Sequence, residues 1–309
     1  MALRDALPWH DLIQAVQSAE QTGYSALFLP EITGRETFAT LAGIATAVPR
    51  LLLASGVVPA SSRTAQTTAM AAATVQDLSG GRMVLGIGSG PSEPGALDRL
   101  RAYVVAVRRL LAGERVEIDG EAAIRLSLAP RDPPPVWIAA LGPRAMRLGG
   151  EVADGVLLNW CTPERVAYAR ERVAEGASDA GRDPAKVTVA VYVRACVGER
   201  EAALSALKAA AGQYASYPAY RRQLDAVGLG EEAATAAAAH ASRRPGEVPE
   251  ALVRALCIEG EVREARVRLE SYREAGADLP VVYPVPALEP LSSILGTLFA
   301  LAPAPASSS

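Results

Sequence analysis

The chain alternates between short, continuously apolar runs and longer segments with helical periodicity. A run that is apolar at every position predicts a strand buried on both faces, because a strand with one wet face alternates apolar and polar residues. Strands that alternate with helices predict βαβ units and a parallel sheet. Seven such runs stand out, at residues 26–29, 51–58, 83–87, 136–140, 155–159, 187–197 and 279–283.

A weaker apolar stretch, Ala2–Arg4, is the candidate for the first strand. With it, eight strand–helix units span roughly 285 residues, which suits a closed (β/α)8 TIM barrel. We therefore expect one α/β domain over residues 1–301. An open doubly wound sheet is the alternative, because the number of strands does not distinguish the two architectures.

Two segments interrupt the alternation, and a third ends it. Residues 114–130 carry the turn Asp119-Gly120 between short β-prone runs, which predicts an inserted hairpin after the fourth helix. Residues 214–249 are rich in alanine, tyrosine and arginine. They predict a helical insertion after the seventh strand that serves as a lid or a subunit contact. Residues 302–309 contain only alanine, proline and serine, which predicts a disordered tail.

Charge and residue counts argue against several classes of function. A net charge of -3 and a pI of about 5.6 provide no positive surface for nucleic acid or an anionic membrane. Cys161, Cys196 and Cys257 lack the spacing of a disulfide scaffold or zinc site, and neither His10 nor His240 follows a strand, so we expect no metal centre. No signal peptide or membrane-length apolar stretch is visible, which predicts a cytoplasmic protein.

The segment Gly86–Gly90 follows an apolar run and precedes a helix, as in a dinucleotide-binding fingerprint. That fingerprint needs a third glycine three residues after the second, and this chain has Pro91 there. Two interpretations stay open. The glycines allow close backbone packing at a strand exit, or the same exit admits a flat ring or a phosphate through Gly88 and Ser89.

The segment Ala140-Leu141-Gly142-Pro143-Arg144 joins a buried strand to a helix predicted over residues 143–152. Proline is tolerated in the first turn of a helix, and the free N–H groups of that turn form an anion site. The alternative is an ordinary helix start with a surface arginine.

Polar side chains follow three other strands. Glu31 comes after the run 26–29, where a carboxylate would face the mouth of a barrel; the alternative is a carboxylate near a helix N-terminus. Asn159 and Trp160 end the run 155–159, and an aromatic ring beside an amide suits the wall of a ring-binding site, although Trp160 also suits a core or rim position. Arg63 lies on a turn after Gly56-Val57 and is otherwise a solvated cation.

Several of these segments, in this order, resemble the luciferase-like monooxygenase family. The resemblance covers roughly residues 8–290, and its most specific parts are Ser79-Gly80-Gly81-Arg82 with Gly86–Gly90, and Ala153-Asp154-Gly155-Val156. The segments 140–144 and 151–160 look like the branch of this family that depends on the deazaflavin coenzyme F420, related to methylenetetrahydromethanopterin reductase.

The resemblance implies a barrel with an insertion, usually dimeric, and assigns roles to individual residues. Gly56-Val57 matches a bulged strand with a non-proline cis peptide that backs the coenzyme ring. Gly88 and Ser89 would line the coenzyme, and the segment Ala140–Pro143 would present its backbone to the phosphate. Glu31 matches an acidic position near the ring, and Trp160 would contact the coenzyme. Sugar-phosphate dehydrogenases of this branch have a histidine where this chain has Ile32, so their substrate is not carried over.

The resemblance thus predicts an oxidoreductase that transfers a hydride between F420 and a small organic substrate, acting as a homodimer. Glu31 is the candidate polar group near the reacting carbon, and Arg63 and Asn159 are candidate substrate or ring contacts. One alternative keeps the fold but binds FMN as a monooxygenase. A second is a barrel subunit without catalytic activity.

Overall fold

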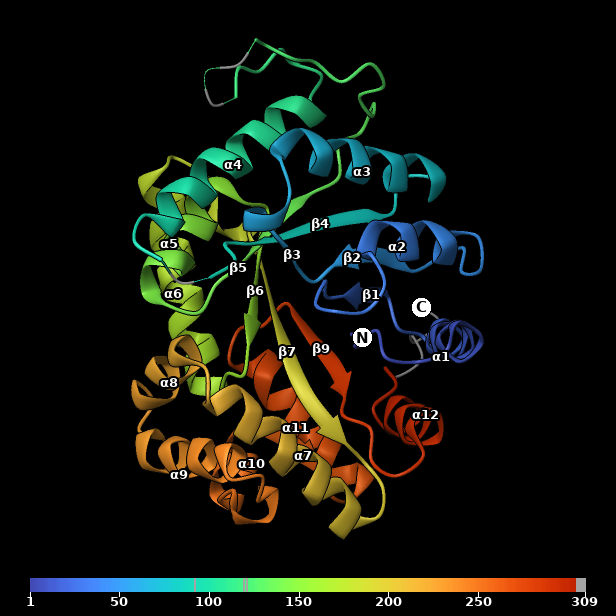
Figure 1. Cartoon of the computed structure of the whole chain (residues 1–309), viewed down its shortest axis with the longest axis vertical. Coiled ribbons are helices and arrows are strands. Elements are labelled where there is room, and N and C mark those ends of the chain that lie inside the picture. The colour runs from blue at the N-terminus through green and yellow to red at the C-terminus, as the bar shows by residue number, and fades with distance from the viewer. Residues whose placement is uncertain (92, 119, 121, 304–309) are drawn as a thin grey trace.

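The structure is a computed structural model that describes residues 1–91, 93–118, 120 and 122–303. Its strands form a central sheet with helices around it (Figure 1). Helices and strands alternate through the first half of the chain. The elements are α1 (Trp9–Gln21), β1 (Ala26–Leu29), α2 (Thr37–Ala45), β2 (Leu52–Ser55), β3 (Val58–Pro59), α3 (Ala65–Leu78), β4 (Met83–Gly88) and α4 (Ala96–Leu111).

The alternation continues in the second half, where several helices in succession separate β7 from β8. These elements are β5 (Val136–Ala139), α5 (Pro143–Val152), β6 (Gly155–Asn159), α6 (Pro163–Asp179), β7 (Thr188–Cys196), α7 (Arg200–Ala215), α8 (Pro218–Asp225), α9 (Gly230–Ala241), α10 (Glu250–Leu256), β8 (Cys257–Glu259), α11 (Val262–Glu274), β9 (Leu279–Pro284) and α12 (Pro290–Ala300).

All the strand pairs are parallel. The hydrogen-bonded order is β1-β2-β4-β5-β6-β7-β8, with β3 paired to β4 and β9 paired to β7. The N-terminal segment contacts both β1 and β9, because the Ala2 N–H donates to the Val282 carbonyl at 2.8 Å and the Leu3 N–H donates to the Phe28 carbonyl at 3.1 Å. The predicted parallel α/β architecture is confirmed. The expected first strand, Ala2–Arg4, is reduced to a single β-bridge between Ala2 and Phe28.

The strands are buried on both faces, as their continuous apolar sequences predict. All six residues of β4 are buried, for example. Side chains on one face of the strands pack together inside the sheet, where Phe28, Trp137, Tyr192 and Tyr283 form its aromatic part. Side chains on the other face form a larger core with the surrounding helices.

The two segments predicted to interrupt the alternation have the following local structure. Val116 and Ile124 form an antiparallel bridge, and Asp119 of the expected turn lies outside the described residues. Helices α8, α9 and α10 gather beside α7 at one end of the molecule (Figure 1). They share a core of their own with Trp160 and Cys257. Of the predicted tail, residues 304–309 lie outside the described residues.

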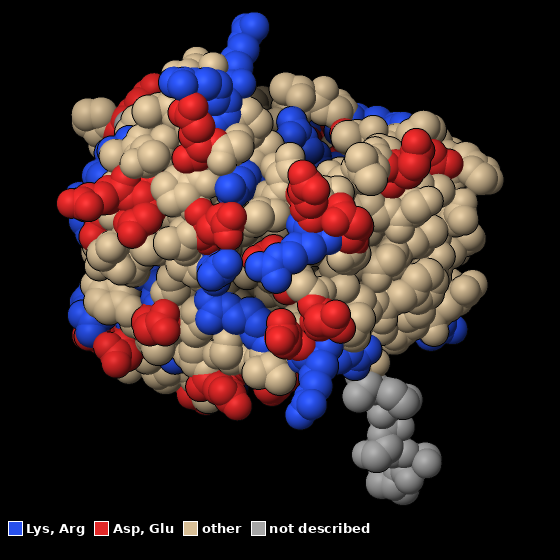
Figure 2. Space-filling model, turned by 90° about the horizontal axis from the view of Figure 1, so that it is seen from below, with Lys and Arg blue, Asp and Glu red and all other residues tan. Residues whose placement is uncertain are grey.

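On the face seen in Figure 2, Lys and Arg side chains are interspersed with Asp and Glu, so charges of one sign do not gather there. Within the described residues, no helix combines the length and apolar character needed to cross a bilayer. The same residues contain no cluster of three or more His, Cys, Asp or Glu side chains suited to a metal ion.

Helices α5 and α6 approach closely enough to exclude side chains at their contact. A Cβ atom at Gly176 would lie 2.0 Å from the Arg147 carbonyl oxygen, and one at Gly150 would lie 2.0 Å from the Val173 carbonyl oxygen. Both positions therefore need glycine for packing. This contact fixes the orientation of α5, whose N-terminus opens on the site described below.

We predict that Gly176→Ala lowers the free energy of unfolding by about 1–3 kcal/mol, because the added methyl group forces the two helices apart. This loss exceeds the roughly 0.5–1 kcal/mol that alanine adds in a helix interior. Denaturant unfolding measures the change. Gly198→Ala is the control, since a Cβ there meets nothing within 4 Å. Equal stability of the two variants would contradict the packing role of Gly176.

Candidate functional site

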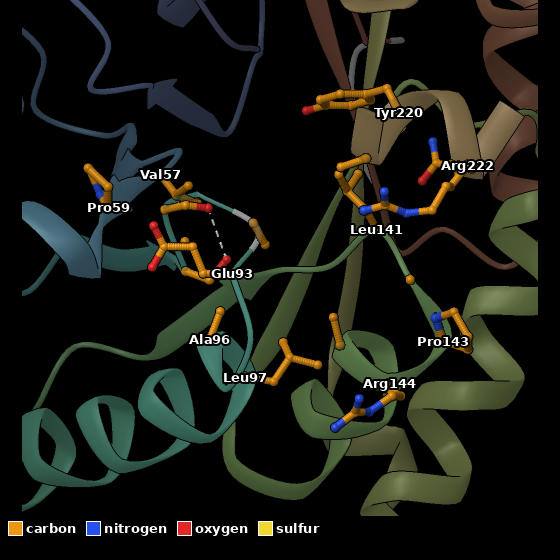
Figure 3. A pocket seen from close by; sticks show the side chains of 18 of the residues that line it. Val57, Pro59, Glu93, Ala96, Leu97, Leu141, Pro143, Arg144, Tyr220 and Arg222 are labelled. Carbon is orange, nitrogen blue, oxygen red and sulfur yellow. Dashed lines mark hydrogen bonds between the residues drawn. The ribbon is translucent and has the colours of Figure 1, made fainter. Parts of the chain in front are cut away.

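A cavity of about 910 Å³ opens where several strands end. Its walls come from residues at or just after the ends of β1 to β5, from the starts of α4, α5 and α6, and from α8. In Figure 3 the labelled side chains form two facing groups, with Val57 and Glu93 on one side and Leu141, Arg144 and Arg222 on the other. Because the carboxyl ends of parallel strands meet at one edge of a sheet, a cavity here collects side chains from distant parts of the sequence.

The cavity brings together more than half of the residues predicted from the sequence. Those that line it are Glu31, Val57, Gly88, Ser89, Leu141, Gly142 and Pro143. The other predicted residues do not line it, and these are Gly56, Arg63, Ala140, Asn159 and Trp160.

The Gly56–Val57 peptide bond is cis, as the family resemblance implies. The Tyr192 hydroxyl donates a hydrogen bond of 2.7 Å to the Gly56 carbonyl, and a Cβ atom at Gly56 would lie only 1.9 Å from that hydroxyl. Burial raises the pKa of Tyr192, so its hydroxyl stays a neutral donor. Gly56 is thus a packed support beneath the cavity, and Val57 is the residue that reaches the cavity surface.

The glycines of the β4 exit allow close packing, and one of them also lines the cavity. A Cβ at Gly86 would lie 2.2 Å from the Ser55 carbonyl oxygen, so the close packing of the two backbones requires glycine at this position. A Cβ at Gly88 would meet Val57 Cγ2 at 2.8 Å, and Gly88 also lines the cavity. The small residue at position 88 leaves room on the cavity side of the strand.

The start of α5 faces open space. Gly142 is the N-cap, Pro143 is the first helical residue, and a Cβ at Gly142 would meet nothing within 4 Å. The Leu141 carbonyl accepts a hydrogen bond of 3.0 Å from Arg165 Nη2, which ties this loop to the start of α6. The unpaired N–H groups of a first helical turn attract anions, and here they border the cavity.

Three arginines line the cavity near this helix start, namely Arg144, Arg165 and Arg222. None of them forms a salt bridge within the described residues. Arg165 is 7% exposed and its Nε atom is buried without a hydrogen-bond partner. Sequence reasoning identified only Arg144. A buried arginine just after the helix-start signal Thr162-Pro163 could have suggested Arg165, whereas nothing local in α8 indicates Arg222.

The opposite wall is acidic but partly neutralised. The Glu31 carboxylate accepts hydrogen bonds of 3.0 and 3.1 Å from Arg63 Nε and Nη2. Arg63 also pairs with Glu36. Burial alone would lower the pKa of Arg63, but the hydrogen bonds and charges of Glu31 and Glu36 outweigh it and raise that pKa. Glu93 on the same wall pairs with Arg99 at 3.5 Å. The cavity is therefore most positive around the α5 start.

The residues outside the cavity have supporting positions. Arg63 orients Glu31 through hydrogen bonds and does not itself line the cavity. Asn159 Nδ2 donates a hydrogen bond of 2.7 Å to the hydroxyl of Tyr220, which does line the cavity. Ala140 is fully buried.

The direct coenzyme contact predicted for Trp160 needs correction. This residue has a left-handed backbone with φ of 53°, is 2% exposed, and packs its ring 4.9 Å from the ring of Tyr214. The chain turns back at the end of β6 and directs the indole into the core shared with α7 and α8. Trp160 supports the wall behind the cavity and does not form its surface.

Comparison with known proteins shows which family this chain resembles in sequence. The family model of the luciferase-like monooxygenases matches residues 2–279. The 5,10-methylenetetrahydromethanopterin reductase of Methanolobus tindarius is 33% identical over 190 residues, which are 56% of this chain and 57% of that protein. The phthiodiolone/phenolphthiodiolone dimycocerosates ketoreductase of Mycobacterium bovis is 34% identical over 197 residues, 57% of this chain and 52% of that protein. The matched part thus spans only slightly more than half the length of these relatives.

Solved structures share the whole fold. The coenzyme F420-dependent tetrahydromethanopterin reductase of Methanopyrus kandleri superimposes with a TM-score of 0.81 at 20% identity, covering 98% of this chain and 96% of that one. An F420-dependent secondary alcohol dehydrogenase, solved with an F420-acetone adduct, has a TM-score of 0.78 at 16% identity, covering 97% of this chain and 98% of that one.

We predict that Tyr192→Phe lowers the free energy of unfolding by about 1–3 kcal/mol, because it leaves the buried Gly56 carbonyl without its donor. It should also weaken binding of any ring that rests on Val57. Tyr24→Phe is the control, since it removes a buried hydrogen bond of 3.0 Å to Leu298 away from the cavity. Chemical denaturation and a coenzyme titration test both effects; equal coenzyme binding by the two variants would rule out support of the ring by Tyr192.

Proposed function

This chain belongs to the luciferase-like monooxygenase family, and we propose on that basis that it is an oxidoreductase that transfers a hydride between coenzyme F420 and a small organic substrate. The observation that carries the proposal is the cavity of about 910 Å³, with an open helix start and unpaired arginines at one end and Val57 with Gly88 at the other. An anionic tail and a flat ring require those two environments together. The two compared structures, both of F420-dependent enzymes, support the choice of F420 over other coenzymes.

The residues present fit this coenzyme. The open space at Gly142 and the unpartnered, buried Nε of Arg165 suit the phosphate of its tail. Arg144 and Arg222 add positive charge on the same wall. The volume lies within the roughly 300–1,000 Å³ of typical ligand cavities. Val57 and Gly88 would lie against the ring, with Ser89 at its edge.

When bound, F420 supplies a ring carbon that accepts or donates a hydride, and the protein supplies placement and polarity. Glu31 lines the cavity and Arg63 holds its carboxylate in one orientation through two hydrogen bonds. We propose that Glu31 accepts the hydrogen bond of a substrate hydroxyl and so orients the carbon that bears it. The Tyr220 hydroxyl, fixed by Asn159, would close the opposite side.

FMN is the alternative coenzyme. Its single phosphate also suits the α5 start, and the protein would then be a monooxygenase that activates O₂. Absorbance separates the two, because a flavin band retained by the purified protein through gel filtration would favour FMN. A barrel subunit without catalytic activity is the remaining alternative. It would be favoured if neither F420 nor FMN quenched the tryptophan fluorescence in a saturable way.

We further propose that the fold is a complete (β/α)8 barrel forming one domain over residues 1–301, with residues 2–4 as its first strand. The hydrogen bonds of Ala2 and Leu3 to both neighbouring strands support this. Residues 214–249 would be the helical insertion. A homodimer agrees with the family resemblance, and the free, buried thiols of Cys161, Cys196 and Cys257 agree with a reducing cytoplasm.

We predict that Gly142→Asp weakens F420 binding at least about tenfold, because it places a carboxylate beside the phosphate; a factor of ten corresponds to about 1.4 kcal/mol. The fold should tolerate the change, since nothing lies within 4 Å of a Cβ there and aspartate is a good N-cap. Gly142→Asn is the matched neutral control and should bind F420 normally. Fluorescence titration measures affinity. Equal weakening by both variants would indicate a steric effect and remove the phosphate assignment.

We predict that Glu31→Gln lowers kcat by about tenfold or more and changes the Kd for F420 less than threefold, because the carboxylate orients substrate and not the tail of the coenzyme. Glu36→Gln is the control, since Glu36 contacts the same arginine but does not line the cavity. Single-turnover reduction or oxidation of F420 gives the rate. A fully active Glu31→Gln enzyme would exclude Glu31 from the reaction.

A further inference from the structure

Arg194, near the end of β7, is a buried cation that forms no ion pair with any described residue. The residue is 4% exposed, and its Nη1 atom is buried with no hydrogen-bond partner. No salt bridge to Arg194 occurs in the described part of the chain; the nearest strand-paired carboxylate, Glu259, is in register with Cys196, and its own Oε2 is also unpartnered. A buried charge is costly unless it is paired, so this arrangement calls for an explanation.

Four aromatic rings surround the guanidinium. The Arg194 Cζ atom lies 3.7 Å from the ring centroid of Tyr283, 5.1 Å from that of Trp160, 5.4 Å from that of Tyr214 and 5.5 Å from that of Tyr192. Ring faces attract a cation, but they do not replace the hydrogen bonds its N–H groups make in water. The donors of the guanidinium are therefore left for another acceptor.

The four rings around Arg194 are called the aromatic nest below. Other buried polar atoms beside this nest also lack a hydrogen-bond partner among the described residues. They are Asn159 Oδ1, Trp160 Nε1 and Gln223 Oε1. These residues are linked to one another, because Gln223 Nε2 donates to the Trp160 carbonyl at 2.7 Å and to the Asn159 carbonyl at 3.0 Å. Native interiors leave few polar groups unpaired. Trp160 is in contact with Arg194, and Asn159 and Gln223 are linked to Trp160, so several unpaired polar groups lie in one connected region beside this cation.

The nest lies directly behind the cavity wall. Tyr220 lines the cavity, its ring centroid is 5.0 Å from that of Tyr214, and Tyr214 contacts Arg194. On the other side, Tyr192 joins the nest to Gly56 beneath the cavity. Tyr220 and then Tyr214 thus lie between the cavity and the guanidinium, so a molecule in the cavity would reach Arg194 by displacing these two side chains.

We propose that Arg194 binds a carboxylate group of the substrate, so that the substrate class is a small organic acid. This inference rests on the proposed function only in naming the bound acid the substrate. A guanidinium whose faces are covered by rings offers its edge, and a planar carboxylate accepts two parallel hydrogen bonds from that edge. The aromatic walls exclude water and strengthen the pairing.

The test compares carboxylates with their neutral esters. Pyruvate and benzoate at constant ionic strength should raise the Tm of the protein by about 5 °C near a hundredfold excess over Kd, and methyl pyruvate and methyl benzoate should not. Arg194→Met should abolish the shift, and Arg194→Lys should weaken binding about tenfold or more, because lysine lacks the planar fork. Arg194→Lys keeps the charge and carries the test if Arg194→Met does not fold.

Two control variants separate the proposal from its alternatives. Arg254→Met removes an exposed arginine paired with Glu250 at 3.0 Å and should leave the carboxylate shift unchanged. Glu259→Gln should also retain it; a shift that appears only in Glu259→Gln and not in the wild type would mean that Glu259 already compensates Arg194 within the protein, and would overturn the proposal. A carboxylate shift that is absent from the wild type, or that persists in Arg194→Met, would overturn the proposal.

An F420 titration of the same variants distinguishes this inference from the proposed function. F420 affinity should be the same in wild type, Arg194→Met and Arg254→Met. Normal F420 binding without an Arg194-dependent carboxylate effect would refute the carboxylate site alone. An Arg194-dependent carboxylate effect in a protein that does not bind F420 would refute the proposed coenzyme alone.

Discussion

The hydrogen bond of 2.7 Å from the Tyr192 hydroxyl to the Gly56 carbonyl connects the inside of the sheet to the floor of the cavity. Tyr192 belongs to β7, and Gly56 follows β2 on the opposite part of the sheet. The contact needs glycine at position 56, because a Cβ would lie 1.9 Å from the hydroxyl. It holds Val57 at the cavity surface, and Val57 in turn packs against Gly88. The site depends on this chain of close contacts.

Arginines divide the site into environments with different chemistry. Arg63 is satisfied by Glu31 and Glu36, so its effect is to hold a carboxylate in place. Arg144, Arg165 and Arg222 line the cavity without ion pairs in the described chain, which gives one wall a positive potential. Arg194 is deeper, almost fully buried, and surrounded by rings. The three arginines around an open helix start suit an anionic tail, and the single arginine among the four rings suits a second, smaller anion.

Local sequence signals were sufficient to predict the bounds of elements that depend on a few neighbouring residues. The helix predicted over residues 143–152 and the strand predicted over 155–159 have those bounds in the structure. Proline is the first residue of the helix, and glycine is the first residue of the strand. The cis Gly56–Val57 bond and the cavity positions of Gly88 and Gly142 followed from the family resemblance. The sequence left a core position for Trp160 open beside a coenzyme contact, and the structure places its ring in the core with a left-handed backbone that no sequence pattern specifies.

The sequence by itself determined the order of strands and helices, the burial of the strands and the residues that follow each strand, since these depend on periodicity and on glycine and proline over a few residues. Only the tertiary structure decided that Arg165 and Arg222 face the same cavity from α6 and α8, and that Arg194 is buried without an anion. The physical reason is that pairing and burial of a charge depend on atoms contributed by elements far apart in the chain, and their distances are fixed only when the sheet and its helices pack.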